Sequence, residues 1–475
     1  MQAKQNSFFY HIYCIVRQWL SSQWESSMVI HWLTHQRNVT GPFMGRWVQW
    51  FHARYCSLFH RLRLPKLLAG SLFLQPLLFV SLAVVLLPLL PTMGIMALVC
   101  ASFFSLALCL GVDRTRSLCP SPLNSYVLLY AVVYLYATLT STSLQGSLFP
   151  GLLTILFVLF FFAVTSCGIR QETLPKLLGA MVGVGVLVSL YGFYQAVFPS
   201  QFRNVWTDTD MFSSIAFRVY STLENPNVLG EYFLLVIPLG AALLVTARSW
   251  KGRILWLAAC VIMGVCLILT YSRGCYLGLL FAMAMFLVLK DRRFLILGIV
   301  AVALCPLYLP ETVLSRFTSI GDMGDTSTSY RVYIWMGTLA MLKDYWFCGV
   351  GPGTEAFNKV YPEYAYNAIT APHSHNLYLQ ITCDTGIAGF VIFLLLLVGF
   401  YRMMFTAIRQ ETDKQLKTFQ IAGVSAVSGF LLQSMTDYTF YNYRVMLLFW
   451  AMLGLCVLFA RLGHKAPVET EAAHD

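Results

Sequence analysis

Residues 69–90 read AGSLFLQPLLFVSLAVVLLPLL, a stretch that contains no charged side chain. A helix needs about 20 apolar residues to cross the hydrocarbon core of a bilayer, so this stretch is long enough to span a membrane. Similar runs recur along most of the chain, and we predict about twelve spans. They lie at about 69–90, 93–111, 126–143, 148–166, 177–198, 228–247, 254–271, 275–290, 294–309, 386–407, 419–437 and 445–462.

The composition agrees with a membrane protein. Of 475 residues, 58% are hydrophobic and 11% are charged, and the mean hydropathy is +0.67. A soluble particle of this size would need more polar surface. The formal net charge of +11 could suit nucleic acid, but Lys and Arg form short clusters between apolar runs, which is typical of membrane topology. We therefore predict an all-α, polytopic transmembrane bundle with no nucleic-acid partner.

The cysteines and the two ends of the chain add little chemistry. The 13 cysteines are scattered, many of them inside apolar runs, with no C-x-x-C pair. They are expected to be small buried hydrophobes, with no metal site and no cofactor. The amino terminus has too short an apolar core for a cleavable signal peptide. We expect a basic, aromatic, interfacial region at 1–66, a transmembrane domain at 67–463 and a disordered tail at 464–475.

Charge sets the expected orientation. If the basic flank before the first span is cytoplasmic, every second loop should also be inside and basic. The chain then has both termini in the cytoplasm of a multi-pass cytoplasmic (inner) membrane protein, and the long loops 199–227 and 310–385 lie outside, carrying short amphipathic helices. The clusters are Arg54, Arg61, Arg63 and Lys66; Arg114 and Arg116; Arg170 and Lys176; Arg248, Lys251 and Arg253; Lys290, Arg292 and Arg293; Arg409, Lys414 and Lys417; Arg461 and Lys465.

The first candidate binding segment is FRVYSTLENPNVLGEY, residues 217–232. Arg218, Asn225 and Asn227 stand at the entry to a span whose start is marked by Pro226, a residue suited to a first helical turn. Ionisable and polar groups at such a depth are candidates for function. The alternative for the two asparagines is a helix cap in a solvated loop.

The second candidate is the hairpin TYSRGCYLGLL at 270–280, where Arg273 interrupts two apolar helices. A tight outer turn has no topological need for a positive charge, because positive charges favour the inside. Arg273 is therefore expected to face an anionic ligand. The alternative is that its side chain extends to the lipid headgroups.

The third candidate is TSTSYRVYIWMGTLAMLKD at 326–344, which reads as an amphipathic helix with Arg331 in its first turn. A cation there opposes the helix dipole, so Arg331 is not expected to serve helix stability. An anion bound at that end would meet both the guanidinium and the free N–H groups. We expect Thr328 or Ser329 to cap the helix and GVGPG at 349–353 to end it. The apolar residues expected at helical spacing are Trp335, Leu339 and Leu342.

The fourth candidate is APHSHNLYLQITCDTGIAGF at 371–390, where His373, His375 and Asn376 lead into a span. Two histidines at i and i+2 cannot face one way on a helix and no third ligand is near, so zinc is not expected. A histidine at the membrane mouth suits a general base or a donor to phosphate. Asp437, at the outer end of another span, could orient such a base, or it could cap its loop.

Three arginines and a histidine that converge on an outer vestibule would bind a diphosphate, because guanidinium groups pair bidentately with phosphate oxygens. A neutral sugar alone would not require them. The sequence therefore predicts binding residues Arg218, Asn225, Asn227, His373, Asn376 and Asp437 around His375, Arg273 and Arg331.

Over roughly 120–460 the chain resembles the O-antigen ligase and polymerase superfamily of bacterial membrane glycosyltransferases. It looks most similar to cyanobacterial proteins named as inorganic-carbon (bicarbonate) transporters. The resemblance rests on the order and spacing of four short patterns. They are R-V-x-S-T-x-x-N-P-N, the S-R-G hairpin with Arg273-x3-Leu277, S-x-R-x-x-x-W around Arg331, and His375-x10-Gly386 followed by Gly389.

The resemblance implies a GT-C-like architecture and a metal-independent glycosyltransferase. A polyprenyl diphosphate-linked glycan would be the donor, and a hydroxyl of a glycan or lipid acceptor would attack it at the outer face of the cytoplasmic membrane. By this resemblance Arg273 and Arg331 hold the diphosphate, with Arg218 as a further contact, and His375 activates the acceptor or assists the leaving phosphate.

Two other functions remain open at this stage. An anion (bicarbonate) transporter could use outer arginines to attract its substrate, but the sequence shows no matching pair of broken spans in two halves, and its polar residues cluster at one face. A structural or assembly protein would have no use for arginines at outer helix junctions.

Overall fold

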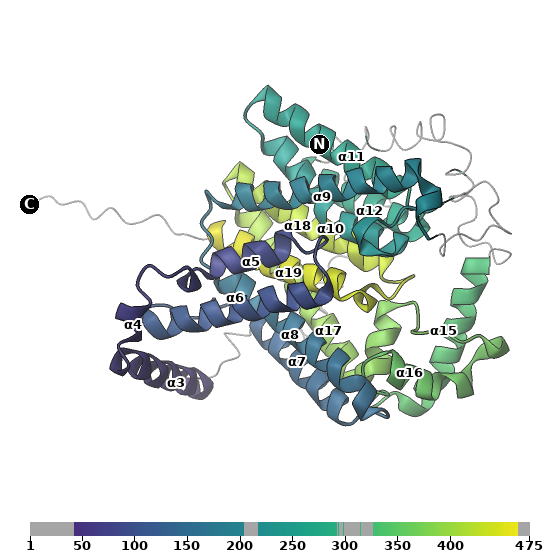
Figure 1. The fold of residues 1–475 in the computed structure, drawn as a ribbon, viewed down its shortest axis with the longest axis horizontal. Coiled ribbons are helices and arrows are strands. Elements are labelled where there is room, and N and C mark those ends of the chain that lie inside the picture. Colours follow the sequence, from purple (N-terminus) through teal and green to yellow (C-terminus); the bar gives the residue numbers. More distant parts are fainter. Residues whose placement is uncertain are drawn as a thin grey trace, which may run out of the picture.

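The computed structural model describes residues 42–203, 217–291 and 326–463, with the isolated positions 293, 298 and 314. Within this part of the chain every regular element is helical (Figure 1), which confirms the predicted fold class. The α-helices are α3 (Pro42–Arg61), α4 (Leu64–Leu67), α5 (Pro76–Val85), α6 (Thr92–Val112), α7 (Asn124–Leu139), α8 (Leu144–Ser166), α9 (Leu174–Val197), α10 (Pro226–Thr246), α11 (Trp250–Ile268), α12 (Arg273–Asp291), α15 (Thr326–Tyr345), α16 (Thr354–Val360), α17 (Leu377–Gln410), α18 (Lys414–Gln433) and α19 (Tyr443–Gly463). Short 3-10 helices are η2 (Leu72–Leu74), η3 (Pro199–Gln201), η4 (Ser221–Leu223), η6 (Tyr361–Tyr364), η7 (Tyr366–Ala368) and η8 (Thr439–Tyr441).

Eight of the described helices are long and apolar enough to cross a membrane: α6, α8, α9, α10, α11, α12, α17 and α19. Helix α18 corresponds to the predicted span at 419–437, but it is too polar to join this set and is buried along most of its length. The predicted span at 294–309 falls almost entirely outside the described residues.

The stretch at 69–90 is not one continuous span. It folds as η2, then the ten-residue helix α5, then a turn before α6 begins at Thr92. Pro76 occupies the first turn of α5, and Pro88 and Pro91 lie in or beside the turn that follows. Because proline lacks an N–H and clashes with the preceding helical turn, these residues divide the apolar run. Ten residues rise only about 15 Å, half of the hydrocarbon core.

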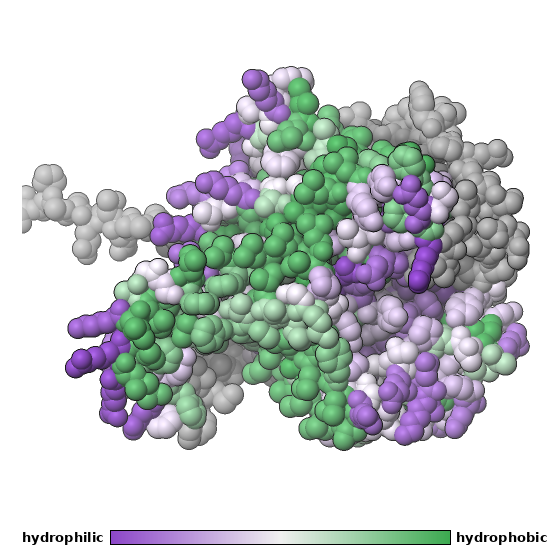
Figure 2. Space-filling view, viewed as in Figure 1, coloured by the Kyte–Doolittle hydropathy of each residue, from purple (hydrophilic) through white to green (hydrophobic). Residues whose placement is uncertain are grey.

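The bundle is organised around α10, α18 and α19. Of the 18 most apolar consecutive residues in each helix, 89% are buried inside the protein in α10 and 83% in α19. In α11, at the periphery, the share is 22%. Helix α10 packs against α18, α11 and α9, and α18 packs against α12 and α19. In Figure 1, α15 and α16 lie at the end opposite α3 and α4. Figure 2 shows an apolar band between polar surfaces at these two ends, as expected of a bundle immersed in lipid.

Helix α3 forms most of the described part of the predicted interfacial region. It packs on the second half of α6, where the Tyr55 hydroxyl donates to the Ala107 carbonyl (3.1 Å) and His52 Nε2 lies 3.0 Å from the Leu110 carbonyl. Its opposite side exposes Trp50, Phe51 and Leu58. The interfacial role of 1–66 stays a prediction.

Helix α17 is broken at Gly386, whose backbone adopts φ 67° and ψ −171°. The Ile387 N–H donates to Trp346 O (2.8 Å) and Cys383 O accepts from Val350 N–H (2.6 Å), so the helical bond between residues 387 and 383 is replaced by two bonds to the segment 346–350. A Cβ at position 386 would collide with the Phe347 carbonyl. GVGPG is therefore more than the end of α15, because it also completes the broken turn of α17.

Helix α15 lies in the second predicted outer loop but differs in detail from the prediction. It begins at Thr326, so Thr328 and Ser329 lie inside its first turn and neither is the cap. Its packed face carries Ile334, Met341 and Leu342, whereas Leu339 is 53% exposed. Apolar side chains thus occur on both faces, and the helix is not cleanly amphipathic. The described part of the other outer loop carries only η3 and η4.

Candidate functional site

A continuous chain of polar contacts joins four segments at the end of the bundle near α15. Arg218 donates from Nε to the Thr270 carbonyl (2.9 Å) and from Nη2 to Asn227 Oδ1 (2.9 Å). Asn227 Nδ2 donates to Asp437 Oδ2 (2.8 Å), and Asp437 Oδ1 lies 3.2 Å from His375 Nδ1. We call Arg218, Asn227, Asp437 and His375 the His375 network.

Helix amino termini build this end of the bundle. Asn225 caps α10 by accepting from the Asn227 N–H (2.8 Å), and Pro226 begins that helix. Asn376 caps α17 by accepting from the N–H groups of Tyr378 and Leu379, and its own amide donates to the Met435 carbonyl (2.8 Å). These bonds match the capping alternative for Asn225 and give Asn376 a structural role. Helix amino termini also favour a bound anion.

His375 is held in an unusual conformation. Its φ of 50° lies in the left-handed region, where a non-glycine residue is uncommon and costs about 1–3 kcal/mol. Trp335 Nε1 donates to its carbonyl (3.3 Å), and the Tyr330 ring lies edge-on at 5.9 Å. The side chain keeps 21% of its surface exposed. The surrounding contacts therefore fix the imidazole without closing it off.

Asp437 remains ionised because its neighbours outweigh its burial. Burial alone would raise the pKa of this carboxyl, but the hydrogen bond from His375, together with the charge of Arg331, lowers the pKa below its usual value. An ionised carboxylate only accepts hydrogen bonds, so Nδ1 of His375 must carry the proton. Among the hydrogen bonds of the described residues, none involves Nε2 of His375, which carries the lone pair whenever the ring is neutral,.

His373 is buried beside His375, with ring centroids 4.2 Å apart. Burial and the neighbouring His375 lower the pKa of His373 to about 3, so the ring is neutral at physiological pH. Both histidines lie in the loop before α17 rather than on a helix. Within the described residues, no three His, Cys, Asp or Glu side chains come together in a way that could hold a metal ion.

Of the remaining two arginines, Arg331 lies near the network and Arg273 begins a helix that contacts it. Arg331 is near enough for its charge to lower the pKa values of Asp437 and His373. Arg273 is the half-buried first residue of α12. Its helix touches the network at Cys275, whose thiol donates to the Asn227 carbonyl (3.6 Å). Next to it, Gly274 packs so closely on α18 that a Cβ would collide with Gln433.

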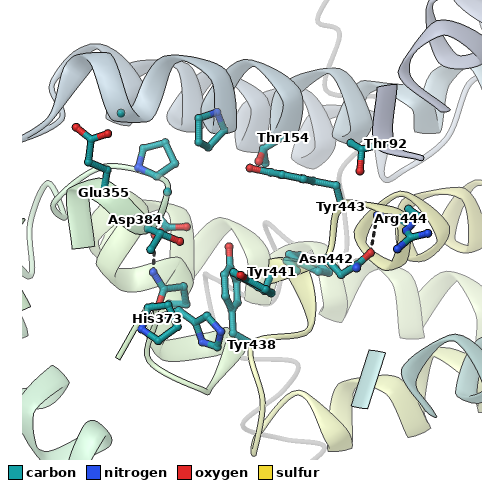
Figure 3. Close-up of a pocket in the computed structure, with 18 of the residues that line it drawn as sticks. Thr92, Thr154, Glu355, His373, Asp384, Tyr438, Tyr441, Asn442, Tyr443 and Arg444 are labelled. Atoms are coloured by element: carbon teal, nitrogen blue, oxygen red, sulfur yellow. Dashed lines mark hydrogen bonds between the residues drawn. The ribbon is translucent and has the colours of Figure 1, made fainter. Parts of the chain in front are cut away.

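A cavity of about 550 Å³ opens on the other side of His373. Figure 3 shows its lining, with Asp384, Tyr438 and Tyr441 around His373, and Glu355 and Arg444 farther along the walls. We call this the tyrosine cavity. Its walls come from the loop before α17, the α18–α19 connection, the start of α16 and the facing helix α8.

Sequence reasoning missed a second chain of contacts that supports the histidine loop. The Ser374 N–H donates to Gln380 Oε1 (2.7 Å), Gln380 Nε2 donates to Asp384 Oδ1 (2.8 Å), and the Tyr134 hydroxyl donates to Asp384 Oδ2 (3.3 Å). The available signal was the pair of polar residues one helical turn apart in LYLQITCDTG, since buried polar residues in an apolar helix are often functional. The buried Arg444 was also missed.

The fold and site define a polytopic helical membrane protein with a cationic, histidine-containing site at one end of its bundle. Residues 258–394 match the family described as O-antigen ligase. This match, over less than a third of the chain, supports the resemblance to the O-antigen ligase and polymerase superfamily. No curated protein matches the chain.

The matched region contains Arg273, Arg331 and His375 but ends before Asp437 and begins after Arg218. The match bears on the ligase and polymerase part of the resemblance seen in the sequence. The similarity to inorganic-carbon transporters stays a prediction.

Proposed function

We propose that this protein transfers or polymerises a glycan from a polyprenyl diphosphate-linked donor to a glycan or lipid acceptor, at the outer face of the cytoplasmic membrane and without a metal ion. The observation that carries this proposal is the contact between His375 and the ionised Asp437, placed beside Arg218 and within the electrostatic reach of Arg331.

In the proposed reaction, Nε2 of His375 takes the proton of an acceptor hydroxyl as its oxygen attacks the anomeric carbon of the donor. The bond from that carbon to the diphosphate oxygen breaks, and the polyprenyl diphosphate leaves with the electron pair. Asp437 accepts from Nδ1 and stabilises the imidazolium that forms, as a carboxylate does in other histidine-based catalytic groups. General base catalysis of this kind contributes about 10²- to 10⁴-fold in rate.

Arginines supply the other half of the proposed mechanism. Negative charge grows on the diphosphate as the bond breaks, so fixed guanidinium groups stabilise the transition state more than the bound donor. Arg273 and Arg331 are the proposed diphosphate ligands. Arg218 already donates to Thr270 and Asn227, so we assign it to holding the network in position, with the diphosphate as a further contact.

The test is a purified, full-length enzyme in lipid nanodiscs, supplied with a polyprenyl diphosphate glycan and candidate acceptors. We expect release of polyprenyl diphosphate together with a lengthened acceptor. We expect the rate to fall about 10²- to 10⁴-fold in His375→Ala with the protein still folded, as shown by an unchanged elution profile and melting temperature. An unchanged rate in this variant would remove His375 from the chemistry.

The same variant separates the enzyme from the predicted alternative, an anion transporter. Vesicles that contain the protein should show no bicarbonate uptake above empty vesicles. Uptake that persists in His375→Ala, with no glycan transfer by the wild-type protein, would reject the proposed activity in favour of transport.

A further inference from the structure

The tyrosine cavity has the opposite chemistry to the His375 network. Its lining includes three carboxyl side chains, Glu224, Glu355 and Asp384, and one guanidinium, Arg444. The one guanidinium lies 3.6 Å from the Glu224 carboxylate, so the lining offers a diphosphate little attraction. A cavity of about 550 Å³ falls within the range of about 300–1,000 Å³ in which proteins bind small ligands. The cavity therefore suits a ligand without negative charge.

The lining combines flat rings with hydrogen-bonding groups. Tyr441 is 50% exposed and its ring centroid lies 4.7 Å from that of His373. Asn442 and Tyr443 continue the same wall (Figure 3). A ring face packs on apolar C–H surface, while carboxylates, amides and hydroxyls satisfy neighbouring hydroxyl groups. A sugar presents both kinds of surface at once.

A second cavity, of about 510 Å³, adjoins the first and shares Pro91, Glu224 and Arg444 with it. Arg444 stands at the junction, where Nη1 donates to the Thr222 carbonyl (2.9 Å) and Nη2 lies 3.6 Å from the exposed Glu224 carboxylate. Its side chain is only 8% exposed. The two cavities therefore meet at Arg444 and Glu224.

We propose that the tyrosine cavity is a subsite for an uncharged, hydroxyl-rich sugar segment of one of the two glycan substrates, lying beside His373. This proposal rests on the proposed function for the identity of the ligand. The segment belongs either to the acceptor or to the donor glycan, since both must approach His375.

The test measures sugar binding without requiring catalysis. Full-length protein in nanodiscs is screened against an array of defined oligosaccharides, uncharged or containing uronic acids, and the bound sugars are confirmed by saturation-transfer NMR. We expect uncharged oligosaccharides to bind and Tyr441→Ala to weaken their binding about fivefold, as expected from loss of one ring contact. Tyr366→Ala is the matched control, because Tyr366 is similarly exposed (46%) and does not line the cavity.

Tyrosine-dependent binding of uncharged sugars by a protein that transfers no glycan would support this subsite while rejecting the proposed enzyme. The subsite is overturned if uronic-acid oligosaccharides bind more tightly than uncharged ones, if none of the uncharged sugars binds, or if Tyr441→Ala binds as the wild type does. In an active enzyme, Tyr441→Ala should raise KM about fivefold for only one substrate. That substrate is the one whose sugar occupies the cavity.

Discussion

The His375 network and the tyrosine cavity meet at His373 but are built differently. In the network, each polar side chain is bonded to another part of the protein, and Asp437 is only 7% exposed. In the cavity, Tyr441 is half exposed and the Glu224 side chain is 84% exposed. Groups that act on developing charge need to be fixed before the reaction, whereas groups that bind hydroxyls gain from freedom to adjust. The difference suggests a rigid reacting centre beside a more adaptable binding region.

The largest expected effect falls on the network. Asp437→Asn keeps the size of the side chain but cannot hold Nδ1 of His375 as a charged acceptor, so we expect kcat to fall about 10³-fold or more. The measurement is polyprenyl diphosphate release at saturating substrates.

Asp344→Asn is the control for that experiment, because Asp344 is an exposed carboxylate on α15 that accepts only from the Tyr364 hydroxyl among the described hydrogen bonds. It should stay within about twofold of wild type, as surface substitutions usually do. If both variants lose activity equally, the distinction between the fixed network and its surroundings is wrong.

A smaller effect is expected for Arg218→Lys. Lysine keeps the charge but lacks the planar fork that reaches both Thr270 O and Asn227 Oδ1,. Loss of a hydrogen bond to a charged group costs about 1.5–3 kcal/mol, so kcat should fall about tenfold to a hundredfold.

Arg444→Lys provides the contrast on the cavity side, and it should change KM for a glycan substrate more than kcat. Equal changes in kcat for the two variants would show that both regions act on the chemical step.

The support of the histidine loop can be tested through Gln380. In Gln380→Leu the buried Ser374 N–H loses its acceptor, which costs about 1–3 kcal/mol of stability and releases the left-handed backbone of His375. We expect a lower unfolding temperature together with lower kcat. Gln145→Leu, on the exposed first turn of α8, is the control and should change neither the unfolding temperature nor kcat. A Gln380→Leu variant with normal stability and rate would show that the histidine loop keeps its conformation without Gln380.

The smallest effect concerns the pH dependence of stability. Because the pKa of His373 is lowered to about 3 in the folded protein and is about 6.5 when unfolded, the unfolded state binds more protons between these values. The contribution of His373 to the free energy of unfolding is therefore fully present above pH 6.5. It declines at lower pH, by at most about 1.4 kcal/mol per pH unit. Thermal unfolding at pH 7 and pH 5 should show this loss, and His373→Gln should reduce it. Identical pH dependence in the two proteins would contradict the assigned state of the ring.

The sequence predicted the class of fold because apolar runs and basic loops are local signals. It also placed Arg218, Asn227, His375 and Asp437 beside helix ends on one predicted side, which is why the structure could bring them together. It failed where the outcome depends on neighbours in space. The prolines of 69–90 outweighed its hydropathy, and α15 turned Leu339 outward. The spacing of Gln380 and Asp384 marked them as polar residues of one helix face, but nothing local indicated that they would contact the histidine loop or that a cavity would form beyond it.

The break in α17 also bears on how the chain is assembled during synthesis. Isolated in lipid, a helix interrupted at Gly386 would leave the Cys383 carbonyl and the Ile387 N–H without partners, which is costly where no water can reach them. The segment 346–350 supplies both partners, and it lies upstream in the chain. This segment has therefore already left the ribosome when α17 emerges. The Cys383 carbonyl and the Ile387 N–H can then pair with it as soon as α17 enters the bilayer.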